Sequence, residues 1–335
     1  MPEVVVWGAG AIGGVIGAWM ARSGVDVLLV DRDPEHVAVI QRDGLLVDGV
    51  REPFRVRVRC SSPADAPGQV DLAFLAVKCM HTPGALDDLA PRLAPGGAIV
   101  SVQNGLNERL IADRVGAERT VGCFVNFGAD WQAPGHVQHG GEHPIFVGEL
   151  DGRHTERIAH VQALLARFCE THVTEDVWGY LWSKLCYASL LFATALVDAP
   201  VAEIVADPAC GRVLQRVVRE VMQVPQARGI RLQRLVDYWP EDYETMDCGP
   251  AMQRCAAHFR GQLKVKTGVW RDLAVRKRRS EVDCQVGAAV REGAELGLDL
   301  PMNRRLIELI HEVEEGRRPM AWDNLRELGA AASSR

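Results

Sequence analysis

Residues 4–22, VVVWGAGAIGGVIGAWMAR, carry the strongest indication of the fold of this chain. Its first four residues are an apolar run typical of a buried strand, the glycines that follow form a tight turn, and residues 15–22 have helical spacing. A second apolar run at residues 25–30 completes a strand–helix–strand unit whose parallel strands are buried on both faces. We therefore expect the chain to begin with a parallel α/β sheet.

The alternation of strands and helices continues beyond this first unit. Apolar runs predict strands at residues 72–77 and 98–102, and helical spacing predicts helices at residues 83–93 and 107–115. Repeated alternation of this kind implies an α/β Rossmann fold, a doubly wound parallel sheet with helices on both faces.

The pattern changes after about residue 121. We expect residues 133–137 and 145–149 to form antiparallel strands that close the sheet, with a helix at 154–170 and a strand at 172–174 to follow. The later segments all have helical periodicity, broken by proline, glycine or aspartate: 176–198, 206–229, 247–276, 281–296 and 302–315.

Two domains follow from this change, an α/β domain over residues 1–175 and an all-α domain over residues 176–335, and 335 residues suffice for two cores. The net charge of -6 argues against a nucleic-acid partner. Residues 177–197 are apolar enough to suggest a membrane span, but Lys184 lies inside this segment, which favours a buried core helix. We therefore expect no membrane partner.

The chain contains nine cysteines without any C-x-x-C pair, and its N-terminus has no leader pattern. We therefore expect free thiols and a cytoplasmic location. Two groupings could suggest a metal site but lack the spacing of a zinc motif, so we expect no metal. They are His136, His139 and His143, and Cys248, Cys255 and His258.

A cofactor site is predicted at the glycine-rich turn. Gly8, Gly10 and Gly13 form a G-x-G-x-x-G pattern after a predicted strand and before a predicted helix, the context in which this pattern binds a dinucleotide. Gly8 permits the tight turn, and Gly13 lets helix and strand pack closely. Gly10 leaves room for a pyrophosphate at the positive helix end, where Ala11 and Ile12 would also bind it.

The end of the second strand carries Asp31, 18 residues after Gly13. A carboxylate there accepts hydrogen bonds from the ribose hydroxyls and repels a 2′-phosphate, which favours NAD. Arg32 follows directly, and its guanidinium could pair with a 2′-phosphate instead. The cofactor is therefore NAD or NADP, with NAD favoured by Asp31.

Lys184 is the only charged residue in an otherwise uncharged helical segment. Burying an ammonium group is costly unless it is paired or faces a polar cleft, so Lys184 is a candidate to protonate a ketone oxygen. The alternative is a lysine whose head group simply reaches solvent from an amphipathic helix. Glu281 follows Ser280 at the expected start of a late helix, where Ser280 and Asp283 resemble a capping box. The alternative is that Glu281 has only a structural role, as a glutamate in the first turn of a helix that the helix dipole favours.

These residues, with others spread along the chain, resemble the ketopantoate reductase (2-dehydropantoate 2-reductase) family. The further matching segments are Ala76-Val77-Lys78, Gln103-Asn104-Gly105, Pro134-Gly135, Trp182-Ser183-Lys184-Leu185, Asp272-Leu273, Glu281-Val282-Asp283 and Pro301-Met302-Asn303. The resemblance implies a Rossmann domain joined to an all-helical domain like that of 6-phosphogluconate dehydrogenase-like reductases. It also implies an NAD(P)-dependent oxidoreductase that reduces the C2 carbonyl of a 2-oxo acid in pantothenate biosynthesis.

The resemblance implies a role for each matching residue. Lys184 corresponds to the catalytic lysine and Glu281 to its partner carboxylate, while Asn104 contacts the nicotinamide end and Lys78 lies at the cofactor cleft. In the mechanism that the resemblance implies, hydride passes to the C2 carbonyl, and Lys184 stabilises and protonates the alkoxide that forms.

Three positions depart from the family pattern. Ala188 and Phe192 stand where members that reduce ketopantoate carry asparagines, and Gly268 stands in place of a serine. A pocket that loses hydrogen-bonding groups changes its substrate, so we expect a bulkier, more apolar 2-oxo acid or the matching 2-hydroxy acid. Ser189 or Thr194 could supply compensating hydroxyls, which leaves ketopantoate itself open.

Two further functions stay open at this point. A dinucleotide-binding redox sensor without catalysis needs only the glycine loop and Asp31, although Lys184 and Glu281 argue for an enzyme. An opine-type or amino-acid dehydrogenase would need an amine co-substrate. The apolar helical domain makes a homodimer plausible.

Overall fold

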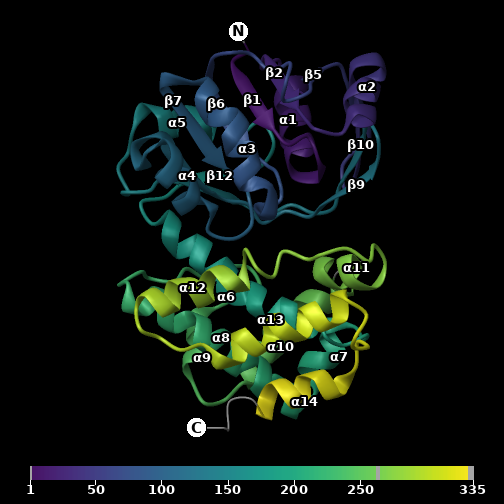
Figure 1. Ribbon diagram of the computed structural model, residues 1–335, viewed down its shortest axis with the longest axis vertical. Helices are drawn as coiled ribbons and strands as arrows, with labels where there is room; N and C mark the ends of the chain where they lie inside the picture. Colours follow the sequence, from purple (N-terminus) through teal and green to yellow (C-terminus); the bar gives the residue numbers. More distant parts are fainter. Residues whose placement is uncertain (1, 262–264, 331–335) are drawn as a thin grey trace. The chain divides into compact units, whose positions relative to one another are not determined.

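The computed structural model describes residues 2–261 and 265–330. The chain divides into two compact units, Met1–Trp178 and Gly179–Arg335, and each is described by itself (Figure 1).

The first unit is built on an eight-stranded sheet with the order β12-β11-β8-β7-β6-β1-β2-β5. Its strands are β1 (Val4–Trp7), β2 (Val27–Val30), β5 (Arg59–Ser61), β6 (Val70–Leu75), β7 (Leu93–Ser101), β8 (Thr120–Phe124), β11 (Ile145–Glu149) and β12 (Thr171–Val173). All neighbours pair in parallel except β11 and β8, which are antiparallel. The predicted doubly wound, mostly parallel sheet is confirmed.

Helices cover both faces of this sheet. They are α1 (Ala11–Arg22), α2 (Pro34–Asp43), α3 (Thr82–Leu89), α4 (Asn107–Val115) and α5 (Glu156–Leu165). Successive side chains of a strand point to opposite faces, and β1 shows the result. Val4 and Val6 pack in a core with α1 and α5, whereas Val5 and Trp7 pack in a second core with α3 and α4. Burial on both faces explains why β1 is apolar throughout.

A separate four-stranded sheet with the order β4-β3-β10-β9 corrects one prediction. Its strands are β3 (Leu45–Gly49), β4 (Phe54–Val56), β9 (Ala129–Ala133) and β10 (His136–His139). Residues 133–137, expected to close the main sheet, instead contain the end of β9, the turn at 134–135 and the start of β10, and β10 pairs in parallel with β3. Alternating polar and apolar residues indicate a half-buried strand but not the sheet that it joins.

The second unit is helical, as predicted. Its helices are α6 (Val177–Thr194, which begins in the first unit), α7 (Val201–Ala206), α8 (Pro208–Ala227), α9 (Pro240–Glu244), α10 (Gly249–Arg260), α11 (Gly268–Ala274), α12 (Val286–Glu295), α13 (Pro301–Glu314) and α14 (Trp322–Ala330). The single helix expected at 247–276 is two helices, α10 and α11. Within the described residues, no helix is long and apolar enough to cross a membrane.

The start of α13 is held by a side chain from α8. The Glu220 carboxylate accepts hydrogen bonds from the backbone N–H groups of Met302 and Asn303, at 3.1 and 3.0 Å, and from the Asn303 amide at 3.0 Å. Burial raises the pKa of Glu220. The carboxylate supplies the partners that the first N–H groups of a helix lack, and so joins α8 to α13.

Candidate active site

Glycine is present at the three positions of the turn after β1 for different structural reasons. Gly8 has φ +102°, and a Cβ atom there would lie 2.8 Å from the Val77 backbone nitrogen. A Cβ at Gly13 would lie 2.0 Å from the Gly8 carbonyl oxygen. A Cβ at Gly10, by contrast, would have no atom within 4 Å. Gly8 and Gly13 are therefore required by the packing of the chain, whereas Gly10 borders open space at the start of α1, which suits the approach of a pyrophosphate.

Asp31 lies at the end of β2, beside this turn, and its carboxylate is held by two backbone groups. It accepts hydrogen bonds from the N–H of Ala9 at 2.8 Å and of Asp33 at 3.0 Å. The exposed Arg32 points its guanidinium to the His81 ring, with 3.2 Å between Nη2 and Nε2. Burial and the charges of Arg32 and Lys78 lower the pKa of His81. A neutral His81 accepts the hydrogen bond that Arg32 donates.

Lys78 and Asn104 follow β6 and β7, the next strands of the same sheet, and both are partly buried. Because β1, β2, β6 and β7 are parallel, their carboxyl ends share one edge of the sheet. The chain order reverses between β1 and β6, and ligands of open α/β sheets bind at such a switch point. The structure therefore brings together the glycine turn, Asp31, Lys78 and Asn104 at this edge.

Gln103 joins the two loops that carry Lys78 and Asn104, a role that sequence reasoning missed. The side chain is 5% exposed, and its amide donates to the Val77 carbonyl at 2.7 Å and to the Thr82 hydroxyl at 2.8 Å. Asn107 completes the connection, because it accepts from the Thr82 hydroxyl at 2.9 Å and donates to the Asn104 carbonyl at 2.8 Å. The Gln103-Asn104-Gly105 segment stood out in the sequence as a match to the family pattern, but the sequence did not indicate these hydrogen-bond partners.

In the second unit, Lys184 lies on a face of α6 that is not wholly buried. Tyr180, Lys184 and Leu191 are partly exposed, and Ala188, on the same face by helical spacing, is 9% exposed. Phe192 is 2% exposed. Lys184 is therefore partly accessible, whereas Ala188 and Phe192 of the same helix are buried.

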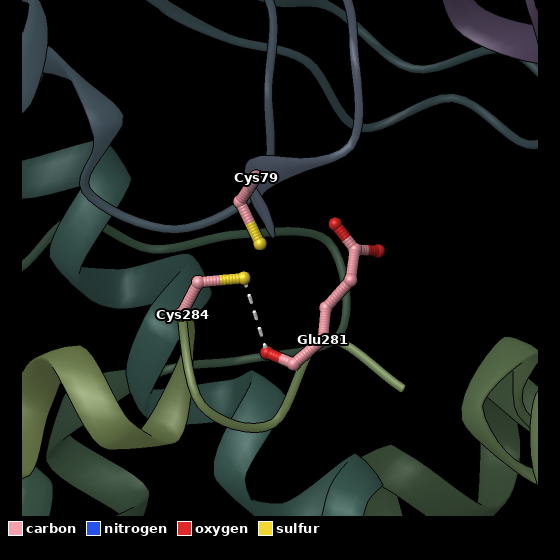
Figure 2. A group of neighbouring side chains, drawn as sticks. All are labelled: Cys79, Glu281 and Cys284. Carbon is pink, nitrogen blue, oxygen red and sulfur yellow. Dashed lines mark hydrogen bonds between the residues drawn. The ribbon is translucent and has the colours of Figure 1, made fainter. Parts of the chain in front are cut away.

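Glu281 is not in the first turn of a helix, which corrects the prediction. Residues 281–285 form turns before α12, and Figure 2 shows Glu281 and Cys284 in this segment. The Glu281 carbonyl accepts from the Gln285 N–H at 3.0 Å, and the Cys284 Sγ atom lies 3.6 Å from the same oxygen. Asp283 does not cap the segment, because its carboxylate contacts His311 at 3.1 Å. Turn hydrogen bonds, rather than a capping box, shape the chain here.

Gly268, the third expected pocket residue, is the first residue of α11 and is exposed. A Cβ atom at this position would have no neighbour within 4 Å. The Thr267 hydroxyl accepts the Trp270 N–H at 3.0 Å and so caps α11. Gly268 therefore adds neither a hydrogen-bonding side chain nor bulk to its surroundings.

Comparisons with known proteins agree with this architecture. Residues 4–152 match the family model of ketopantoate reductase PanE/ApbA, and residues 176–314 match the model of its C-terminal part. The chain is 30% identical over 321 residues to a 2-dehydropantoate 2-reductase of Archaeoglobus fulgidus, covering 94% of this chain and 98% of that protein.

Solved structures show the same likeness. A PanE/ApbA family ketopantoate reductase from Ralstonia eutropha has a TM-score of 0.79 and 28% identity, over 94% of this chain and 99% of that one. A D-mandelate dehydrogenase solved with NADH shares the fold, with a TM-score of 0.79 and 22% identity over 94% and 99% of the two chains. The chain belongs to the ketopantoate reductase family.

Proposed function

We propose that this chain is an NAD(P)-dependent oxidoreductase that reduces the C2 carbonyl of a 2-oxo acid to the 2-hydroxy acid. One observation carries the proposal: the carboxyl edge of the sheet gathers an open glycine turn, an anchored carboxylate, Lys78 and Asn104 at its switch point. The names of the relatives agree with this reaction class. Residues 1–175 would bind the cofactor, and residues 176–335 would carry Lys184 and Glu281.

The proton transfer in this proposal belongs to Lys184. A bound dihydronicotinamide supplies the hydride that reduces the substrate carbon. Lys184 donates a hydrogen bond to the ketone oxygen and transfers a proton to it as negative charge develops there. The Glu281 carboxylate holds the ammonium group and the substrate in place, and Asn104 contacts the substrate and the nicotinamide end.

The structure supports NAD as the preferred cofactor. Two backbone N–H groups hold the Asp31 carboxylate at the end of β2, so it cannot turn away to admit a 2′-phosphate without losing both hydrogen bonds. A fixed carboxylate accepts hydrogen bonds from the ribose hydroxyls and repels a phosphate. NADP is the second candidate, because Arg32 and His81 lie together nearby and a guanidinium pairs well with phosphate.

Two substitutions separate these cofactors. The ratio of kcat/KM with NADH to kcat/KM with NADPH should fall when Asp31 is replaced by asparagine, since the repulsion is removed. Arg32→Ala should leave that ratio unchanged or raise it. A wild-type preference for NADPH that Arg32→Ala abolishes would select the second candidate.

The substrate that we propose is more apolar than ketopantoate. Ala188 is on the partly exposed face of α6, four residues after Lys184, and offers a methyl group where an asparagine would offer an amide. Phe192 contributes an apolar ring, and Gly268 has no side chain. A site without these amides cannot discriminate for substrate hydroxyls. An Ala188→Asn variant should therefore gain activity on ketopantoate relative to aromatic and branched 2-oxo acids.

The alternative of a cofactor-binding sensor predicts a different result. In a sensor, Lys184→Ala changes neither dinucleotide affinity nor any NADH consumption, because there is none to lose. In the proposed enzyme, the same variant binds NADH normally and loses turnover. The proposal also places the enzyme in the cytoplasm.

A further inference from the structure

His36, in α2, is a buried histidine next to the glycine turn. Only 1% of its surface is exposed, and both ring nitrogens have partners. Nε2 lies 2.9 Å from the Ala9 carbonyl oxygen, and Nδ1 lies 3.0 Å from the Gly135 backbone nitrogen. Trp131 also points its indole N–H at Nδ1, at 3.4 Å. The ring therefore stands between the glycine turn and the β9–β10 turn.

The β9–β10 turn determines which ring nitrogen carries the proton. Nδ1 accepts the Gly135 N–H, so Nδ1 is unprotonated and Nε2 carries the hydrogen. Nε2 must then donate to the Ala9 carbonyl. Gly135 has φ +68°, and a Cβ there would lie 2.4 Å from a Val39 methyl group of α2, so glycine allows the close approach.

The hydrogen bond from His36 orients the peptide group between Ala9 and Gly10. A trans peptide is planar, and its C=O and N–H point in opposite directions. With the Ala9 oxygen turned to His36, the Gly10 N–H points away from the ring. The preceding peptide is held as well, because the Ala9 N–H donates to Asp31 at 2.8 Å. Both peptides that flank Ala9 are therefore fixed before any ligand arrives.

We propose that His36 is a positioning residue for the dinucleotide. By holding the Ala9 carbonyl, it directs the Gly10 N–H at the start of α1 toward the cofactor pyrophosphate. The Pro134-Gly135 turn, which belongs to the second sheet, contributes by keeping His36 in the donating tautomer. The inference rests on the proposed function, since it concerns how the glycine turn binds a dinucleotide.

Two substitutions of His36 separate its two hydrogen bonds. Glutamine places an amide N–H near the position of Nε2 and can still donate to Ala9. Asparagine places its oxygen near the position of Nδ1, so it can accept from Gly135 but cannot reach Ala9. Both lose the ring, so they lose similar packing. The same two substitutions of His160, an exposed residue of α5, are matched controls.

The measurement is the dissociation constant for NADH and NADPH, by fluorescence titration of the folded full-length chain, beside the melting temperature. The removed hydrogen bond is neutral, so His36→Asn should weaken dinucleotide binding about tenfold. His36→Gln should stay within about threefold of the wild type. The loss should appear in the KM for the cofactor, not in kcat at saturating cofactor.

Equal weakening by both variants, or lower melting temperatures with unchanged dissociation constants, would overturn the inference and leave His36 as a core residue only. If the variants do not fold, ¹⁵N NMR of the wild-type imidazoles decides, because a His36 protonated on Nδ1 excludes the donation to Ala9. Failure of the proposed function looks different, since the wild-type chain would then bind neither NADH nor NADPH.

Discussion

Replacing Gly10 by alanine should weaken cofactor binding without harming the fold. The new methyl group meets no atom within 4 Å, and the backbone at Gly10, with φ -66°, is extended and open to alanine. A glycine-to-alanine change at a compatible position stabilises a protein by about 0.4–1 kcal/mol, so the free energy of unfolding should stay the same or rise slightly. The space that the methyl group fills is the space proposed for the pyrophosphate.

The expected loss of affinity follows from that overlap. Forcing one extra methyl group into a packed contact costs about 1–3 kcal/mol, which corresponds to roughly 5- to 150-fold in the dissociation constant. Calorimetry gives the stability of Gly10→Ala, and fluorescence titration gives its affinity for NADH. Gly68→Ala is the matched control, because that exposed glycine also has no atom near its Cβ position.

Gly13→Ala supplies the contrast. Its methyl group would lie 2.0 Å from the Gly8 carbonyl oxygen, so it should destabilise the first unit itself. A Gly10→Ala variant that binds NADH like the wild type would refute the placement of the pyrophosphate, and one that unfolds like Gly13→Ala would refute the assignment of open space.

Three further predictions concern the second unit and the second sheet. Lys184→Met should lower kcat/KM for NADH oxidation by about 10²- to 10⁴-fold without changing NADH affinity. Lys266→Met, the control at a lysine paired with Asp198, should leave kcat/KM unchanged. Equal losses of kcat/KM in both variants would contradict a catalytic role for Lys184. Glu220→Ala removes three hydrogen bonds at the start of α13, so it should lower the free energy of unfolding, measured by urea denaturation, by about 2–3 kcal/mol. A loss below about 0.5 kcal/mol would show that water replaces the carboxylate. Burial lowers the pKa of His139 from its ordinary 6.5. Between about pH 6.5 and the lowered pKa, the histidine is protonated in the unfolded chain but not in the folded protein. The free energy of unfolding should therefore fall as the pH drops below about 6.5. His139→Gln should flatten that part of the stability profile, and an unchanged profile would assign the pH dependence to other groups.

The first strand and helix could be predicted because their signals are local. A strand buried on both faces is apolar throughout, and the helix start is marked by glycines at 8, 10 and 13. The second sheet could not be predicted, since β4 is short and half-exposed and β10 pairs with β3 from far along the chain. Pairing between distant segments leaves little trace in local periodicity.

The site shows the same division. Asp31 was placed by its distance from Gly13, and the structure holds it beside Ala9. Glu281 was expected at a helix start, but it lies in a turn segment before α12, where its carbonyl accepts the Gln285 N–H. The position of His36 could not be predicted from a local motif, because the ring is held by a backbone N–H that lies 99 residues away in the sequence.

A steady-state assay of NADH and NADPH oxidation decides whether this chain is a 2-oxo acid reductase. Ketopantoate and a panel of aromatic and branched 2-oxo acids are the substrates, with the wild-type chain and Lys184→Met compared side by side. We expect Lys184-dependent oxidation of NADH, fastest with a bulky apolar 2-oxo acid. Efficient turnover of ketopantoate alone would contradict the assignment of the pocket, and no turnover of any 2-oxo acid would contradict the reductase itself.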